Sequence, residues 1–455
     1  MAFLKAEAIN EKIIEEVKDY ISQDNRLLLE NLIDNMRPAD LADLIEHLEA
    51  EERLFIFKIL EPEEAGDVLV EIEPPVQESI ISGLDNEVIS DIVEELDSDD
   101  AADLVGDLPN ERAREVIKSV GDEVSEELGK LLPYEEDTAG GIMALEFVAI
   151  RADATVKDAV ETIRGKREEV ENLYYIWAVD DFERLAGHVS LKDLLLESPE
   201  RRINEIMDTE IISVQTNTDQ EEVARLVKKY DLVSIPVVDE RYRLVGRITH
   251  DDIIDVLEEE VDEDISLMAG VIKQEIAEES PLKISRARLP WLIAGLLGGI
   301  LAAAVINQFE SSLERVLALA FFFPVIMAMG GNTGTQAATV AVRGMATGDI
   351  SLVNVGKRLW VEMKVAFVNG IICGVLLGLI VGFWISDYRL GAVVAIALIL
   401  IVLNSGFIGA AVPLVLKRLN IDPAIATGPF VTTLNDILSL LIYLGLVTVF
   451  LSLIG

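Results

Sequence analysis

Apolar residues recur at a fixed spacing through the first third of the chain. One series repeats every twelve residues from Met36 to Val120, and a second repeats at the same interval from Leu44 to Leu128. This spacing is typical of stacked short helices that bury their apolar faces on their neighbours. We therefore expect an all-α solenoid, a helical superhelix, over residues 1–136.

The hydrophobic pattern changes beyond residue 136, and the next segment is written twice. Short runs rich in β-branched residues, such as F-V-A-I at 147–150, alternate with helical patterns. The dipeptide I-M at 142–143 returns at 206–207, and G-H-V-S-L-K-D at 187–193 returns as G-R-I-T-H-D-D at 246–252. The repetition predicts two similar α+β modules, over residues 137–202 and 203–260.

Long apolar stretches dominate the remainder. Five of them are long enough to cross about 30 Å of hydrocarbon. They cover residues 289–308, 316–341, 360–385, 390–416 and 427–452. We expect a bundle of five transmembrane helices over residues 283–455, joined to the second module by an acidic connecting helix over residues 261–282.

Charge divides the chain at the same place as hydropathy. Residues 281–455 hold 7 acidic and 11 basic residues, against 74 and 27 in residues 1–280, so the net charges are +4 and −47. A surface this acidic repels polyanions, which argues against nucleic-acid binding, and it concentrates cations. Solubility alone is the alternative reason for many single carboxylates.

Basic residues give the expected orientation. Lys283, Arg286 and Arg288 precede the first span, and other basic residues are concentrated in the loops on the same side. By the positive-inside rule we expect residues 1–282 to be cytoplasmic and the C-terminus to lie outside the cell. The five spans would be surrounded by the lipid of the cell membrane. The single cysteine, Cys373, allows no intrachain disulfide, and the N-terminus has no signal-peptide pattern.

Polar residues within the apolar stretches are candidates for function, because each costs free energy in lipid. The second stretch contains G-G-N-T-G-T-Q at 330–336, with Asn332 at its centre. In the fifth stretch Gly428, Thr432 and Asp436 recur at a spacing of four and so share one helix face. This face predicts a pore wall. The alternative is a structural carboxylate, with Asp436 paired to Lys364 or to another helix.

The paired modules resemble a tandem CBS domain pair. In that family the Gly-x-x-Ser/Thr-x-x-Asp motif contacts nucleotides, so the resemblance implies that Thr249 and Asp252, with Ser190 and Asp193 in the first copy, are candidates to hold ATP. Many CBS pairs carry the pattern and bind nothing, and this alternative stays open. The sequence contains no P-loop and no Asp-Lys-Thr motif, so an ATP-driven pump, or any other enzyme, is not expected.

The order of solenoid, CBS pair, acidic helix and five spans, with G-N-x-G-x-Q at 331–336 and D-P-A at 422–424, resembles the MgtE family of Mg²⁺ channels. The resemblance implies a homodimer in the cell inner membrane whose pore lies between the subunits. It places Asp436 at the selective point, with Thr432, Gly428 and Asn332 on the pore wall.

The resemblance also implies magnesium homeostasis through a cytoplasmic Mg²⁺ sensor. Its bridging residues would be Asp67, Asp99, Asp103, Gly140, Asp231, Asp252, Asp255, Glu260, Glu263, Asp264 and Asp422. Asp252 falls in both the metal set and the nucleotide set, and the sequence does not decide between them.

These features lead to one functional hypothesis and its rivals. We expect a Mg²⁺-selective channel for divalent cation uptake that closes when Mg²⁺ bridges the acidic cytoplasmic modules, with ATP as a further modulator. The alternatives are an ion-coupled carrier of Mg²⁺ or Co²⁺, in which Asp436 binds the coupling ion, and a non-transporting sensor.

Overall fold

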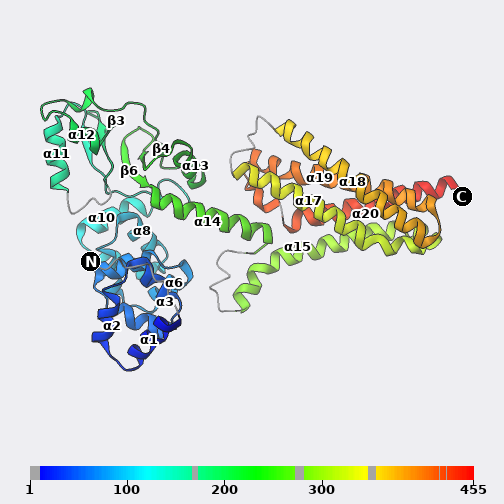
Figure 1. Cartoon of the computed structure of the whole chain (residues 1–455), viewed down its shortest axis with the longest axis horizontal. Helices are drawn as coiled ribbons and strands as arrows, with labels where there is room; N and C mark the ends of the chain where they lie inside the picture. The colour runs from blue at the N-terminus through cyan, green and yellow to red at the C-terminus, as the bar shows by residue number, and fades with distance from the viewer. Residues whose placement is uncertain are drawn as a thin grey trace. The chain divides into compact units, whose positions relative to one another are not determined.

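The structure is a computed structural model that describes residues 11–166, 173–271, 281–346, 355–419, 421–426 and 428–454. It contains two compact units, Met1–Glu260 and Val261–Gly455. Separate hydrophobic cores stabilise them. Figure 1 shows the solenoid in blue and cyan, the β-strands in green and the long helices in yellow to red.

The described residues before Tyr134 form ten short helices, as the twelve-residue period predicts. Their bounds are α1 (Glu11–Ser22), α2 (Arg26–Ile33), α3 (Pro38–Glu46), α4 (Ala50–Phe57), α5 (Pro62–Val70), α6 (Pro74–Gly83), α7 (Asn86–Val93), α8 (Ser98–Gly106), α9 (Asn110–Ser119) and α10 (Asp122–Leu131). From Leu44 to Leu128, every member of the second apolar series is buried. Next-but-one helices such as α3 and α5, or α5 and α7, pack together, so the stack buries a continuous core.

Two small sheets follow, one for each copy of the repeat. The elements are β1 (Ala149–Arg151), α11 (Val156–Gly165), β2 (Tyr175–Val179), β3 (Leu185–Ser190), α12 (Leu191–Leu196), η1 (Ile203–Glu205), β4 (Val214–Gln215), α13 (Gln220–Tyr230), β5 (Ser234–Val238), β6 (Leu244–Thr249) and α14 (His250–Ala269). In each sheet the first strand pairs parallel to the second, and the second pairs antiparallel to the third. The matching topology confirms the repeat.

The two copies are interlocked through their repeated I-M and glycine motifs. A Cβ at Gly246, in the second copy, would lie 2.7 Å from the sulfur of Met143 in the first, and a Cβ at Gly187 would lie 2.6 Å from the sulfur of Met207. The Ala144 amide also donates to the Arg247 carbonyl at 2.8 Å. Each copy therefore needs the other to complete its packing.

The second unit consists mainly of long helices. They are α15 (Pro281–Gln308), α16 (Glu310–Arg315), η3 (Leu317–Phe322), α17 (Phe323–Ala346), α18 (Val355–Ile385), α19 (Tyr388–Arg418), η4 (Pro423–Ala426) and α20 (Pro429–Ile454). Five helical segments within the described residues are long and apolar enough to cross a membrane. The first and third helices begin several residues before the apolar stretches, because the basic residues next to those stretches are helical too.

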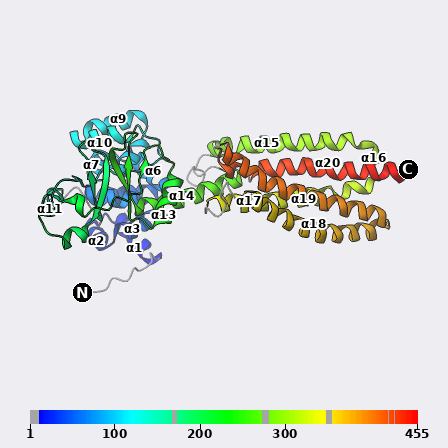
Figure 2. The ribbon, with the colours of Figure 1, turned by 90° about the horizontal axis from the view of Figure 1, so that it is seen from above.

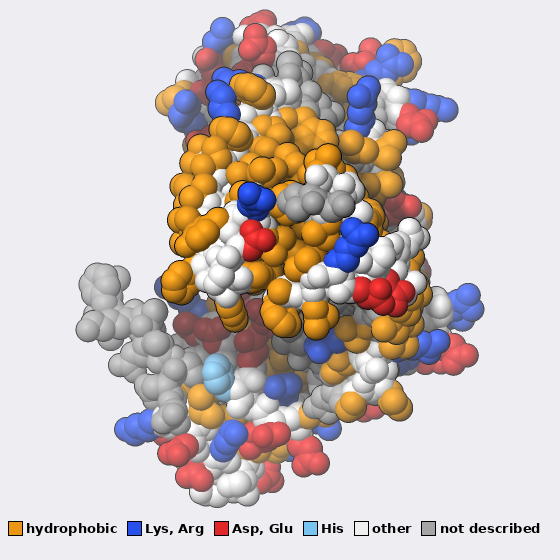
Figure 3. Space-filling model, turned by 90° about the vertical axis from the view of Figure 1, so that its right-hand side faces the viewer, with side chains coloured by type: hydrophobic (Ala, Val, Ile, Leu, Met, Phe, Trp, Pro, Cys, Tyr) orange, Lys and Arg blue, Asp and Glu red, His pale blue; other side chains and the backbone are white. Residues whose placement is uncertain are grey.

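Helix α19 packs against α17, α18 and α20, while α15 packs against α20. The long helices run side by side in Figure 2. Many large hydrophobic side chains of α15 and α18 are exposed, among them Leu292, Leu297, Ile372 and Phe383. Figure 3, which looks onto one end of the structure, shows hydrophobic side chains gathered in the middle of the view with a few charged ones among them. An outer surface of this kind suits a lipid environment, because lipid imposes no penalty on exposed apolar side chains.

Candidate functional site

The beginning of α20 is built to place polar groups at one end of the helical bundle. Asp422 accepts a hydrogen bond from the Ala424 amide at 2.7 Å and so caps η4. Helix α20 then starts at Pro429, which is favoured in a first helical turn. Asp436 lies seven residues further, about 10 Å along the axis.

Thr432 and Asp436 face α17, the other helix with a polar run. A Cβ at Gly331 would lie 3.4 Å from the Thr432 methyl carbon and 3.7 Å from the Asp436 Oδ1. The hydroxyls of Thr335 and Thr432 are 3.5 Å apart. The structure thus brings the two polar stretches together, and it leaves Asn332 exposed on α17.

Close packing explains why a glycine stands at position 428. A Cβ at this position would lie 2.8 Å from the Met268 carbonyl oxygen and 3.4 Å from that of Leu267, at the end of α14. Leu267 and Met268 also pack on a small core that includes Leu414 and Ala424. The absence of a side chain at Gly428 therefore lets the end of α14 approach the start of α20.

Asp436 forms no ion pair with any residue that the structure describes. The Lys364 ammonium, the alternative partner, lies 5.6 Å from the centre of the Trp360 ring on its own helix. A carboxylate without a countercharge at this depth is costly unless it faces water or a cation.

A second group of acidic residues lies in the first unit, where α8 meets the start of α14. Burial, the largest cause, and neighbouring carboxylates together raise the pKa of Asp99, Asp100 and Asp103, to about 8 for Asp100 and about 7 for Asp103. The pKa values of Asp252 and Asp255 on α14 are also raised, to about 6 for Asp255. We call these five residues the α8–α14 acidic cluster.

Sequence reasoning finds four members of this cluster and assigns no metal role to Asp100. It also misses Glu136 and Glu146, which act on Asp103 and Asp99. Glu146 accepts hydrogen bonds from the Ser98 amide and hydroxyl at 3.2 and 2.9 Å. The acidic run 97–103 is the sequence signal for Asp100, whereas no local pattern links Glu146 to a helix nearly fifty residues earlier.

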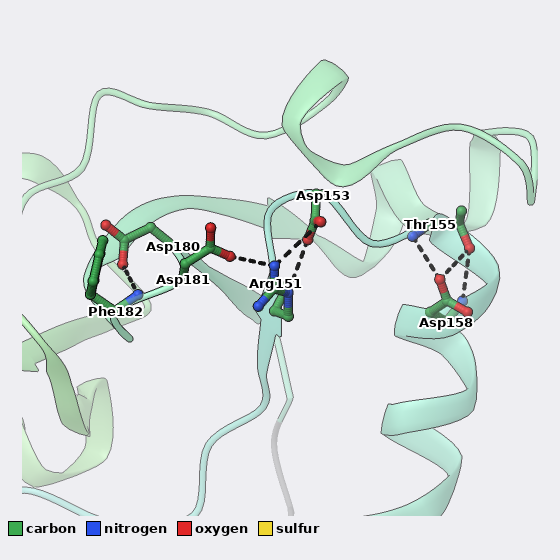
Figure 4. Close-up of polar contacts among 7 residues, drawn as sticks. All are labelled: Arg151, Asp153, Thr155, Asp158, Asp180, Asp181 and Phe182. Atoms are coloured by element: carbon green, nitrogen blue, oxygen red, sulfur yellow. Dashed lines mark hydrogen bonds and ion pairs between the residues drawn. The ribbon is translucent and has the colours of Figure 1, made fainter.

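Acidic residues elsewhere in the same unit have ordinary structural partners. In Figure 4 Arg151 contacts both Asp153 and Asp181. Thr155 caps α11, and Asp158 in the first turn completes this capping box by accepting hydrogen bonds from the Thr155 amide and hydroxyl at 2.9 and 2.7 Å. The bond from Arg151 lowers the pKa of Asp153, and the bonds from Thr155 lower the pKa of Asp158. The α8–α14 acidic cluster has the opposite environment, in which a divalent cation would offset the repulsion.

The cluster is not a preformed metal cage. Within the described ranges, no three acidic, histidine or cysteine side chains have an arrangement that could already hold a metal ion. Carboxylate oxygens are nonetheless the donors that Mg²⁺ prefers, and Mg²⁺ keeps most of its water and needs only one or two of them. The donor chemistry therefore fits Mg²⁺.

The other predicted sensor residues are distributed over both units. In the first unit Asp67 is exposed on α5, Asp231 ends α13 in a left-handed conformation, and Glu260 accepts a hydrogen bond from Gln220 at 2.8 Å. The Gly140 amide donates to the Thr216 carbonyl at 2.8 Å. Glu263 and Asp264 lie on α14 and Asp422 caps η4, all three in the second unit.

The predicted nucleotide residues serve as helix caps. The Thr249 hydroxyl donates to Asp252 at 2.7 Å, and the Ser190 hydroxyl donates to Asp193 at 2.6 Å. Asp252 therefore belongs both to a cap and to the α8–α14 acidic cluster.

A narrow hollow lies between the two CBS copies and, in this structure, leaves no enclosed space for even a water molecule. Its lining is largely aromatic and consists of Phe147, Val148, Leu173, Tyr174, Tyr175, Trp177, Ser234 and Arg247. The buried Ser234 hydroxyl has no hydrogen-bond partner among the described residues. Its aromatic rings, hydroxyl and guanidinium are groups that can stack on and hydrogen-bond a purine nucleotide, but the hollow would have to widen to admit one.

Known proteins are similar to this chain in each of its parts. A family model described as "Divalent cation transporter" matches residues 323–446, one described as "MgtE intracellular N domain" matches residues 36–137, and the CBS domain model matches residues 139–200 and 203–259. The magnesium transporter MgtE of Thermus thermophilus is 42% identical over 323 residues, which cover 70% of this chain and 71% of the relative. That of Bacillus subtilis is 40% identical over 326 residues, 72% of each chain.

Solved structures match the first unit. The cytosolic domain of the Mg²⁺ channel MgtE, in complex with ATP, is 35% identical with a TM-score of 0.51, and the match covers 53% of this chain and 99% of that domain. The soluble part of a magnesium transporter is 28% identical with a TM-score of 0.50, over 55% of this chain and 98% of that one.

Proposed function

The chain belongs to the MgtE family of divalent cation transporters, and from this premise we propose that it is a multi-pass membrane channel that conducts Mg²⁺ past Asp436. One observation carries the proposal. Asp436 lies inside a span, beside Thr432 and Gly331, and no described residue offers it a countercharge. Because Mg²⁺ loses its water reluctantly, a carboxylate that binds the hydrated ion would select it without holding it too tightly.

The proposed pore lies between two copies of the chain. Asn332 and Gln336 share one face of α17 and are exposed in the single chain. Polar side chains in a span face protein or water rather than lipid, so a second copy and a water-filled path are the surroundings that suit them. A homodimer would place two Asp436 carboxylates across one path.

Mg²⁺ flux into liposomes tests this function. We expect wild-type protein to conduct Mg²⁺ without a proton gradient and Asp436→Ala to reduce the flux to that of protein-free liposomes. Glu314→Ala is the matched control, because it removes an exposed carboxylate from α16, outside the five spans.

Two results count against the proposal. Wild-type flux in Asp436→Ala would remove the central carboxylate from the mechanism. Flux that requires a proton or Na⁺ gradient would favour the ion-coupled carrier.

The proposed gate uses α14. Asp252 and Asp255 near its start belong to the α8–α14 acidic cluster, and Leu267 and Met268 near its end approach Gly428. The helix between Asp252 and Met268 is about 24 Å long at 1.5 Å per residue. Mg²⁺ bound at the cluster would hold α14 against α8, and Mg²⁺ loss would let repulsion separate them.

A gate of this kind follows from linkage. Mg²⁺ closes the channel only if it binds the closed arrangement more tightly than the open one. The buried carboxylates supply that difference, because their repulsion is largest when α8 and α14 are packed together. The remaining bridging residues named from the sequence, from Asp67 to Asp422, are proposed to add to this difference.

Further features of the proposal follow from the family and from charge. The solenoid over 1–136, the CBS copies over 137–202 and 203–260 and the connecting segment 261–282 would be cytoplasmic, with the C-terminus outside the plasma membrane. The basic residues beside the first span support this orientation.

ATP is proposed to bind between the CBS copies. A relative's cytosolic domain is known in complex with ATP, and the hollow here, once widened, would offer stacking surfaces and the Arg247 guanidinium. Trp177 lines this hollow and is the sole tryptophan of residues 1–271. In a fragment of these residues, tryptophan fluorescence therefore reports binding directly. We expect ATP to change that fluorescence in a saturable manner, and a flat titration would refute the site.

A further inference from the structure

The contact between α17 and α20 is a set of paired small and polar residues. Gly330 and Gly334 are spaced four apart on α17, and Ser439 and Asn435 are spaced four apart on α20. A Cβ at Gly334 would overlap the Asn435 amide nitrogen, and a Cβ at Gly330 would overlap the Ser439 hydroxyl. Each polar side chain therefore occupies the space that one glycine leaves.

Asn435 is entirely enclosed in this contact, with 0% of its side chain exposed. Among the described residues, neither its amide nitrogen nor its amide oxygen has a hydrogen-bond partner. The buried hydroxyls of Ser439 and Ser405 also have no hydrogen-bond partner among the described residues. Burying an amide without hydrogen bonds costs stability, so packing alone does not account for it.

Asp436 is the next residue along α20 and lies about 100° around the helix from Asn435. The Asp436 carboxylate points toward Gly331, which is the residue after Gly330 on α17. The two helices thus present an inner pair of contacts, Asn435 with Gly334 and Ser439 with Gly330, and an outer contact of Asp436 with Gly331. A rotation of α20 about its axis would therefore change the inner contacts and the direction of Asp436 together.

We propose that Asn435 is a positioning residue, whose amide fits against Gly334 and fixes the rotation of α20 so that Asp436 faces the ion path. The inference rests on the proposed role of Asp436 in conduction. Side chains lie about 5–6 Å from a helix axis, so a rotation of 20° would move the Asp436 carboxylate by about 2 Å. A shift of this size is large for a group that distinguishes hydrated cations, because the effect of positioned groups is lost over about 1 Å.

A buried polar side chain can specify alignment at a cost in stability. A larger apolar side chain at 435 would overlap Gly334. A smaller one would leave a gap beside Gly334, so nothing there would oppose a rotation of α20. Of Gly330, Gly331 and Gly334, Gly334 has the Asn435 amide among its nearest neighbours. The effect of a change at Gly334 is therefore expected to depend on the residue at 435, and the reverse.

The test is a double-mutant cycle in full-length protein in liposomes. The variants are Gly334→Ala, Asn435→Ala and the combination, with Gly445→Ala as a control. Gly445 also lies in α20, but a Cβ there meets no atom within 4 Å. The measurements are Mg²⁺ flux, its apparent KM, the ratio of Mg²⁺ to Ca²⁺ flux, and the amount of folded protein by size-exclusion chromatography.

We expect each single variant to lower the Mg²⁺ to Ca²⁺ ratio by about tenfold and to raise the apparent KM, since Asp436 is then misplaced. The combination should recover most of the ratio, because the methyl group of Ala at 334 fills the space that the amide leaves. Gly445→Ala should behave as wild type. A purely structural role would reduce the amount of folded protein while leaving KM and the ratio unchanged.

Unchanged KM and selectivity in Asn435→Ala would overturn the inference, as would effects of the two single variants that simply multiply. If Gly334→Ala yields no folded protein, Asn435→Ala and Asn435→Ser alone still decide, because both remove atoms and create no overlap. Asp436→Ala, measured beside them, separates the two hypotheses. Wild-type flux in Asp436→Ala refutes the pore proposal, whereas loss of flux there with unaltered Asn435 variants refutes only the positioning role.

Discussion

The pKa of a carboxyl group in this chain depends on the groups around it, and the number of acidic residues does not predict it. Asp158 accepts two hydrogen bonds at a helix start, which lower its pKa, whereas Asp100 is buried among Asp252, Asp97 and Asp103, which together with burial raise its pKa to about 8. A net charge alone therefore does not identify a sensor. The informative carboxylates are those that are buried next to other carboxylates.

Asp100→Asn tests this distinction at one residue. Removing the charge should raise the unfolding temperature of residues 1–271 without Mg²⁺ at pH 8, by about 2–4 °C for each kcal/mol of repulsion relieved. It should also reduce the further rise that Mg²⁺ produces, because one ligand is lost. The check is thermal unfolding with and without Mg²⁺.

Asp91→Asn is the matched control, since Asp91 is exposed on α7. If Asp100→Asn and Asp91→Asn gave equal changes, the cluster would be no more than part of a solvated surface.

Helices α8 and α14 show how two elements can form a switch. Their facing carboxylates have raised pKa values, with values of about 8, 7 and 6 for Asp100, Asp103 and Asp255. A carboxyl group whose pKa is higher when folded stabilises the fold below its unfolded pKa of about 3.9, and this stability is lost as pH rises through the folded value. The packing of α8 on α14 is therefore expected to weaken between about pH 4 and pH 8.

The corresponding measurement is hydrogen exchange of α8 and α14 in residues 1–271. Without divalent cations, protection of both helices should fall as pH rises from 5 to 8, after correction for the intrinsic rate. Millimolar Mg²⁺ should restore it at pH 8. Helix α3, which is remote in sequence from the cluster, serves as the internal reference. Protection that does not change with pH, or that Mg²⁺ does not restore, would contradict the switch.

The whole molecule joins an acidic first unit to an apolar second unit, and the proposed function assigns Mg²⁺ sensing to the first and conduction to the second. The boundary after Glu260 falls within α14, so one helix belongs to both. A continuous helix is stiff over this length and can transmit a local change without a long chain of side-chain contacts. Regulation and conduction should therefore be separable by removing the first unit.

A chain shortened to residues 261–455 tests that separation. In liposomes it should conduct Mg²⁺, and its flux should no longer decline when Mg²⁺ on the cytoplasmic side is raised, because the α8–α14 acidic cluster is gone. Full-length protein provides the reference in the same assay. Closure by Mg²⁺ in the shortened chain would place the sensor within the membrane unit instead.

The sequence by itself determined the elements and their order. The twelve-residue period specified the solenoid, the repeated glycine motif specified the paired sheets, and uninterrupted apolar stretches specified the long helices. These features are local, because each depends on residues within one or two turns or one repeat. Asp436, a carboxylate with no basic residue near it in the sequence, could be recognised for the same reason.

Tertiary structure decided which distant groups meet. It gave Gly428 a partner in Met268, set Asn435 against Gly334, and brought Glu146 to Ser98 across nearly fifty residues. It also decided which acidic residues are buried together, since burial depends on the packing of helices that sequence spacing does not relate. The sequence therefore supplied the charges and the helices, and only the packing turned particular members of each into a site.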